Sequence, residues 1–193
     1  MKRIIVITLA TSITLLTVFT MNYSNGKTID CDGVIENHPE VLEIVTDTLD
    51  TTNTNLIKRL VLPKDNGGLC MGSIFKVKKP IVVYRVWNSS DTSSLKGRWW
   101  TFDKPIGTLE DFRKDYGVCC QWGPKDTLSA CTLKVGSKIV VGPGQSVDCT
   151  HAENRGGDGC NDTRYEISAK NQVYIHDPVN NVENCNGVDW PNK

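Results

Sequence analysis

The cysteines constrain the fold of this 193-residue chain more strongly than any other residue type. All eight lie beyond an apolar amino-terminal stretch. An even number of cysteines in that setting predicts a framework of disulfides formed in an oxidising compartment. None of them has the CxxC spacing of a metal site and the three histidines are scattered, so we expect no bound metal. The eight are Cys31, Cys70, Cys119, Cys120, Cys131, Cys149, Cys160 and Cys185.

The pairing of these cysteines follows only in part from their positions, because eight cysteines allow many connectivities. We expect Cys31 to hold the amino-terminal segment and Cys185 to hold the tail. The two adjacent cysteines should bond to different partners, since a disulfide between neighbours strains the peptide that joins them. Cys149 and Cys160 are candidates to close the polar loop that lies between them.

The amino terminus has the pattern of a secretory signal peptide, which we predict over residues 1–26. Lys2 and Arg3 precede a mostly apolar run at residues 4–20, shorter than the roughly 20 residues that span a bilayer. An uncleaved anchor is the alternative. The rest is expected to be secreted or extracellular, or periplasmic if a bacterium retains it, with no stable membrane association after cleavage.

The charge pattern argues against nucleic acid as a partner. The chain has 22 basic and 22 acidic residues, so its formal net charge is zero. It also has no basic tract of the kind that neutralises a phosphate backbone. We therefore expect no binding to DNA or RNA.

Residues 27–79 are expected to form a small, partly helical segment that packs on the domain that follows. Residues 39–49 carry apolar side chains at helical spacing, which predicts a helix with Pro39 in its first turn. The Thr- and Asn-rich residues 51–55 should break it. Residues 56–62 are compatible with a second helix or with a strand.

Residues 80–193 are expected to form the main domain, built of short strands and one helix. The helix is predicted at residues 108–116, capped by Thr108 and ended by Gly117. Strands are predicted at residues 130–135, 138–141 and 171–175. Residues 142–144, Gly-Pro-Gly, are predicted to turn.

Arg85 is the residue that most needs a partner. It follows the β-branched and aromatic residues 81–84, which are typical of a buried strand, and an arginine there requires either a carboxylate or an external anion. After a polar loop at residues 88–94, a second strand begins at Gly97-Arg98 and carries Trp99 and Trp100. These indoles are either core residues or the aromatic wall of a site.

The order of these motifs resembles the ADP-ribosyltransferase superfamily over about residues 80–176. Tyr84-Arg85-Val86-Trp87, then Gly97-Arg98-Trp99-Trp100-Thr101, and finally Gln172 on the last strand are similar to the secreted toxin domains of that superfamily. The terminal glutamine is similar to that of the tuberculosis necrotising toxin and of fungal surface NAD glycohydrolases. The resemblance implies a disulfide-stapled α+β fold with a split β core and a cleft for NAD.

The resemblance also implies roles for individual residues. Arg85, Thr101 and Gln172 would be catalytic: Arg85 would hold the dinucleotide, the Thr101 hydroxyl would support the site, and Gln172 would hold the nicotinamide ribose. An arginine suits a phosphate because its guanidinium donates two parallel hydrogen bonds. The further residues that would bind NAD are Trp87, Arg98, Trp99 and Trp100.

Gln172 affects the expected reaction, because protein-modifying members of the superfamily usually have a glutamate at this position. An amide binds a ribose hydroxyl but carries no negative charge. We therefore expect an NAD glycohydrolase in preference to a mono-ADP-ribosyltransferase with a protein acceptor, and a role as a toxin or effector. Glu166 is an alternative source of the carboxylate. A non-enzymatic, disulfide-rich secreted module that binds a protein or carbohydrate partner is the alternative from another class.

Overall fold

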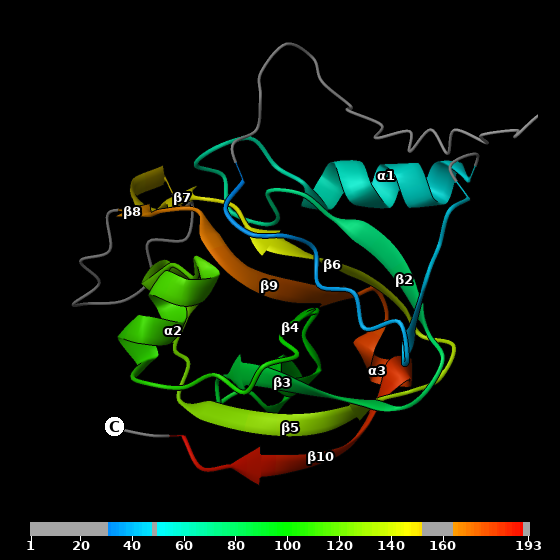
Figure 1. The fold of residues 1–193 in the computed structure, drawn as a ribbon. Helices are drawn as coiled ribbons and strands as arrows, with labels where there is room; N and C mark the ends of the chain where they lie inside the picture. Colours follow the sequence, from blue (N-terminus) through cyan, green and yellow to red (C-terminus); the bar gives the residue numbers. More distant parts are fainter. Residues whose placement is uncertain (1–30, 48–49, 152–163, 191–193) are drawn as a thin grey trace, which may run out of the picture.

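Two antiparallel β-sheets that pack face to face form the body of this α+β protein (Figure 1). The computed structural model describes residues 31–47, 50–151 and 164–190, so the predicted signal peptide lies outside the described residues. The larger sheet has the order β1-β2-β6-β9-β4, and the smaller has the order β10-β5-β3. The strands are β1 (Leu42–Ile44), β2 (Ser73–Val77), β3 (Ile81–Trp87), β4 (Trp99–Trp100), β5 (Thr127–Leu133), β6 (Lys138–Gly144), β9 (Ser168–Ile175) and β10 (Val182–Val188), with a separate pair of β7 (Val147–Asp148) and β8 (Arg164–Tyr165).

The alternation of side chains along the strands divides the apolar residues between two cores. Successive residues of a strand point to opposite faces of its sheet. Phe75 on β2 and Val141 on β6 pack between the sheets with Val83 of β3, and all three are at most 1% exposed. Their neighbours Ile74 and Val140 pack in a second cluster on the opposite face of the larger sheet. Each face of that sheet therefore has its own apolar layer.

Helix α1 (Thr51–Leu60) covers this second face (Figure 1). The side chain of Asp50 caps it by accepting a hydrogen bond from the backbone N–H of Thr52, and Leu56 and Leu60 are buried against the sheet. The prediction that residues 51–55 break a helix is wrong. The burial of one apolar stripe outweighs the weak helix propensity of the threonines and asparagines.

The helix predicted at residues 39–49 is also wrong, because β1 lies there. Leu42 pairs with Val77 of β2 and is 2% exposed, whereas the next residue, Glu43, is exposed. Residues 27–79 thus supply α1 and two strands of the larger sheet.

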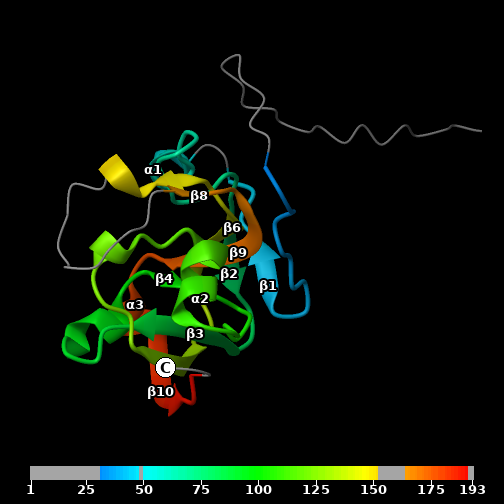
Figure 2. The same ribbon diagram turned by 90° about the vertical axis from the view of Figure 1, so that its left-hand side faces the viewer.

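Helix α2 (Leu109–Tyr116) confirms the helix predicted at residues 108–116. The Thr108 hydroxyl accepts from the Asp111 N–H, while the Asp111 carboxylate accepts from the Thr108 N–H, which forms a capping box. Gly117 ends the helix in the left-handed conformation at φ 57°. In Figure 2, α2 lies in front of the sheets, between α1 and β10. The remaining helical segments are short: α3 (Pro178–Asn181) and the 3₁₀ turns η1 (Thr92–Lys96), η2 (Cys120–Trp122) and η3 (Cys149–His151).

The strands predicted in the second half are present, but the predicted turn at residues 142–144 is not. These residues extend β6, with Gly142 paired to Gln172 and a register irregularity between Pro143 and Gly144. A Cβ atom on Gly142 would overlap the carbonyl oxygen of Met71. The glycine therefore serves the close approach of two backbones, and the proline sits at an irregularity, where a sheet tolerates it.

Three disulfides have both cysteines among the described residues: Cys31–Cys70, Cys119–Cys149 and Cys131–Cys185. The first and third confirm that Cys31 and Cys185 fix the two ends of the domain. The second disulfide rules out the bond between Cys149 and Cys160 that the sequence suggested, because Cys149 pairs with Cys119. The neighbouring Cys120 is disulfide-bonded as well. Such a framework is compatible with an oxidising compartment.

Candidate functional site: a cationic aromatic cleft

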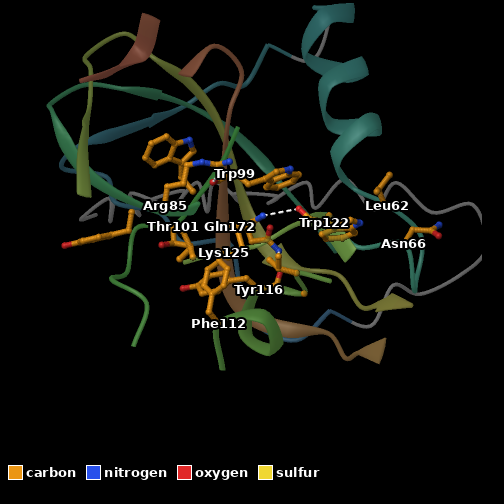
Figure 3. A pocket seen from close by; sticks show the side chains of 16 residues that line it. Leu62, Asn66, Arg85, Trp99, Thr101, Phe112, Tyr116, Trp122, Lys125 and Gln172 are labelled. Atoms are coloured by element: carbon orange, nitrogen blue, oxygen red, sulfur yellow. Dashed lines mark hydrogen bonds between the residues drawn. The ribbon is translucent and has the colours of Figure 1, made fainter. Parts of the chain in front are cut away.

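A cleft of about 460 Å³ opens where the two sheets meet (Figure 3). Its lining comes from β3, β4, α2, the η2 loop and β9. This volume lies within the usual range for small-molecule sites, and the lining is mostly aromatic and apolar with a few polar side chains. The described residues that line it include no aspartate, glutamate or histidine.

Three of the predicted residues, Arg85, Thr101 and Gln172, line this single cleft. The backbone register explains why. Thr101 forms a two-way backbone bridge with Tyr84, at 2.8 and 2.9 Å, which places it beside Arg85. The preceding residue, Trp100, pairs with Val173, the neighbour of Gln172. Residues separated by 87 positions in sequence therefore meet where β3, β4 and β9 lie side by side.

The Arg85 guanidinium is held by main-chain carbonyls. Its Nε donates to the Ser94 oxygen at 2.7 Å, its Nη1 donates to the Trp99 oxygen, and its Cζ lies 5.7 Å from the centre of the Trp100 ring. It makes no ion pair with a carboxylate of the described chain. Burial lowers the pKa of Arg85 to about 10, so the side chain is charged at neutral pH. A partly buried cation without a counter-ion among the described residues favours an anionic ligand.

Gly97 makes room for this guanidinium. A Cβ atom at Gly97 would overlap Nη2 and Cζ of Arg85 and would lie 3.1 Å from its Nε. The φ and ψ of Gly97 are −69° and 173°, which any residue can adopt. The glycine is therefore required by the position of the Arg85 side chain and not by the backbone conformation.

Thr101 and Tyr116 bring two buried hydroxyl groups to the cleft. The Thr101 hydroxyl donates to the carbonyl oxygen of Asp103 at 2.7 Å. Burial, and then the charge of Asp103, raise the pKa of Tyr116 above its ordinary value. The phenol is thus neutral at physiological pH and serves as a hydrogen-bonding group rather than as a base.

Gln172 is 8% exposed, and its orientation is fixed. Its Nε2 donates to the main-chain oxygen of Tyr116 at 3.1 Å. A Cβ atom at Gly144 would lie 2.9 Å from the same nitrogen, so this glycine accommodates the amide. No described residue donates a hydrogen bond to Oε1, which leaves that oxygen as an acceptor for a ligand hydroxyl.

Lys125 adds a second positive charge to the cleft. Its Nζ donates to the carbonyl oxygen of Trp122 at 3.1 Å. Burial lowers the pKa of Lys125, and the neighbouring charges of Arg85 and Arg113 lower it further. Arg85 and Lys125 repel each other, and none of the described lining residues is acidic, so the cleft again favours an anion.

The tryptophans predicted to bind NAD divide into two groups. Trp99 and Trp100 both line the cleft, although Trp100 is 2% exposed and belongs mainly to the core. Trp87 does not line it, because its indole N–H donates to the Ser129 hydroxyl. Arg98 also lies outside, where it is exposed and donates to the Tyr174 hydroxyl.

Glu166 does not provide the carboxylate that Gln172 lacks. Its side chain is 77% exposed, pairs with Arg164 at 3.1 Å and does not line the cleft. Tyr116, Trp122 and Lys125 also line the cleft, although no motif of the sequence singled them out. Trp122 could have been noticed in the sequence, because it is an aromatic residue in a turn next to two adjacent cysteines.

Further properties of the described chain bear on the function. No cluster of three or more potential metal ligands occurs among its described residues. None of the helices described is long and apolar enough to cross a membrane. Comparisons of the chain with models of protein families, with curated proteins and with solved structures found no match.

Proposed function

We propose that this protein is a secreted enzyme of the ADP-ribosyltransferase-like superfamily that binds NAD and hydrolyses its nicotinamide–ribose bond. The observation that carries the proposal is the meeting of Arg85, Thr101 and Gln172 in one cleft, beside Trp99. These are the residues that the motif order singled out, and they come from β3, from β9 and from the position just after β4. Residues selected from sequence motifs that had no bearing on a common site would not be expected to line the same cleft.

The charges of the cleft fit the diphosphate of NAD. Arg85 retains N–H groups at Nη2 beyond its two carbonyl contacts, and Lys125 lies close enough for each charge to affect the other. A diphosphate would neutralise both Arg85 and Lys125 without displacing either side chain from its present position. The aromatic wall at Trp99 would pack against a flat, partly apolar ring.

The proposed reaction needs little acid or base assistance. The bond between the nicotinamide nitrogen and ribose C1′ breaks, its electron pair leaves with nicotinamide, a water oxygen bonds to C1′, and a proton goes to solvent. Nicotinamide leaves as a neutral molecule and needs no protonation. Gln172 Oε1 would hold the ribose hydroxyl while the cleft orients the dinucleotide.

Water is the preferred acceptor in this proposal because no described residue of the lining carries a carboxylate that could activate a protein side chain. A transferase acting on a protein would release nicotinamide but no free ADP-ribose. Identification of the product therefore separates the two reactions.

The test is an NAD-consumption assay on the oxidised protein, with chromatography of the products. We expect nicotinamide and free ADP-ribose in equal amounts. Arg85→Ala and Gln172→Ala should lower kcat/KM by at least about a hundredfold, the cost of roughly 3 kcal/mol. Arg59→Ala is the matched control, since Arg59 lies on α1, outside the cleft. Intact NAD, or equal turnover by Arg85→Ala and the control, would refute the proposal.

A non-enzymatic binding module is the second candidate, and the absence of any aspartate, glutamate or histidine from the described lining favours it. In that case the Trp-lined cleft would hold an anionic group of a protein or carbohydrate partner. This function predicts no affinity for NAD, so binding of an anionic protein or carbohydrate ligand, with neither binding nor consumption of NAD, would select it.

A further inference from the structure

Trp122 is an exposed tryptophan at the mouth of the cleft. It is 43% exposed, whereas Trp100 is 2% exposed. Figure 3 shows Trp122 on the side of the cleft that faces Leu62 and Asn66, away from Arg85. An indole with this much exposed surface contributes little to the core and is available to a ligand.

The backbone on both sides of Trp122 is held firmly. Its N–H donates to the Cys119 oxygen at 3.1 Å, and its carbonyl accepts from Lys125. The Cys119–Cys149 disulfide ties the same turn to the segment around β7. A rigid aromatic surface loses little conformational entropy when a planar group stacks on it.

Asn66 contributes a polar group at the same end of the cleft. Its backbone is fixed by a bridge to Val147, and its exposed side-chain amide makes no hydrogen bond to any described residue. Gly67 follows it, and a Cβ atom there would lie 3.3 Å from the Trp122 ring. The backbone next to Asn66 therefore approaches the indole, and Asn66 and Trp122 line the same end of the cleft.

We infer that Trp122 and Asn66 form a subsite for the adenine base of the dinucleotide. Adenine stacks on the exposed indole, and the Asn66 amide donates to a ring nitrogen and accepts from the exocyclic amino group. Arg85 and Lys125, which line the same cleft, then hold the diphosphate. The inference rests on the proposed function and assigns the base that the enzyme selects.

The test is calorimetric titration of the oxidised protein with ADP-ribose and with inosine diphosphate ribose, in which an oxo group replaces the amino group of adenine. We expect the wild-type protein to prefer ADP-ribose by about tenfold. Asn66→Ala should bind the two equally. Trp122→Ala should weaken both by about tenfold, and Trp122→Phe should restore most of the loss because it keeps an aromatic face.

Nicotinamide mononucleotide and an unrelated asparagine complete the design. Nicotinamide mononucleotide lacks the adenine, so Asn66→Ala and Trp122→Ala should leave its affinity unchanged. Asn186→Ala, on β10 and outside the cleft, should leave all three affinities unchanged. If Asn66→Ala and Trp122→Ala bind ADP-ribose as the wild type does, the subsite is refuted and the proposed function stands. If no ligand binds to the wild type and NAD is not consumed, the proposed function itself fails.

Discussion

Gly97→Ala is predicted to displace the Arg85 guanidinium without altering the main chain. The new methyl group would overlap Nη2 and Cζ, while φ −69° and ψ 173° suit alanine as well as glycine. The side chain must then give up its bonds to the carbonyl oxygens of Ser94 and Trp99. Hydrogen bonds that involve a charged group contribute about 1.5–3 kcal/mol each.

The expected loss of stability follows from these values. Loss of both bonds would cost about 3–6 kcal/mol, and alanine would return about 0.4–1 kcal/mol by restricting the unfolded chain. Partial rebinding of the guanidinium reduces the loss further, so we expect the free energy of unfolding to fall by about 3 kcal/mol. Affinity for ADP-ribose should fall by at least about tenfold, because the cation leaves its position.

Urea denaturation followed by tryptophan fluorescence measures the stability, and calorimetry measures the affinity. Gly187→Ala is the matched control, because a Cβ atom at Gly187 would meet no atom within 4 Å and its φ is not positive. If Gly97→Ala and Gly187→Ala have the same stability and the same affinity for ADP-ribose, Arg85 does not occupy the position described.

Three more predictions concern the cleft and its framework. Gly144→Ala should push the Gln172 amide aside, lowering NAD turnover by about tenfold and the free energy of unfolding by about 1 kcal/mol. Enzyme kinetics and urea denaturation measure the two effects, and unchanged turnover would contradict the prediction. Because burial lowers the pKa of Lys125, the unfolded chain binds more protons just below pH 10.5, so stability should rise with pH there while ADP-ribose affinity falls. Lys125→Met should reduce the slope of both titrations without abolishing it, since Arg85, with a pKa lowered to about 10, titrates in the same range, and unchanged slopes would contradict the prediction. Replacing Cys131 and Cys185 by serine, which opens a 54-residue connection, should lower the free energy of unfolding by about 4 kcal/mol in the oxidised protein, and equal melting of both forms argues against it.

Local signals in the sequence predicted those elements whose stability is local. Helix α2 has its cap, its first-turn acids and its terminal glycine within ten residues, so the pattern was sufficient. The segment at residues 39–49 carried a short helical periodicity, but pairing of Leu42 with Val77 determined its structure. That pairing joins residues 35 positions apart, so it cannot be predicted from the residues next to Leu42 in the sequence.

The site was predictable where its residue types were unusual for their position. An arginine in an apolar strand pointed to Arg85, and the motif order pointed to Thr101 and Gln172. Trp122 and Lys125 lie in the turn beside the adjacent cysteines, and distant contacts such as the Cys119–Cys149 disulfide hold that turn in place. Trp87 was misassigned because its indole finds a hydroxyl at Ser129, 42 residues later.

The backbone bridge between Tyr84 and Thr101 provides a way to measure how often the two sheets separate at the cleft. Arg85 belongs to the smaller sheet and Gln172 to the larger one, and this bridge joins their backbones at the cleft. The amide protons of Tyr84 and Thr101 should therefore exchange with deuterium at the rate at which the sheets part there. A dinucleotide that touches both Arg85 and Gln172 would slow that exchange, whereas one that touches a single sheet would leave it unchanged.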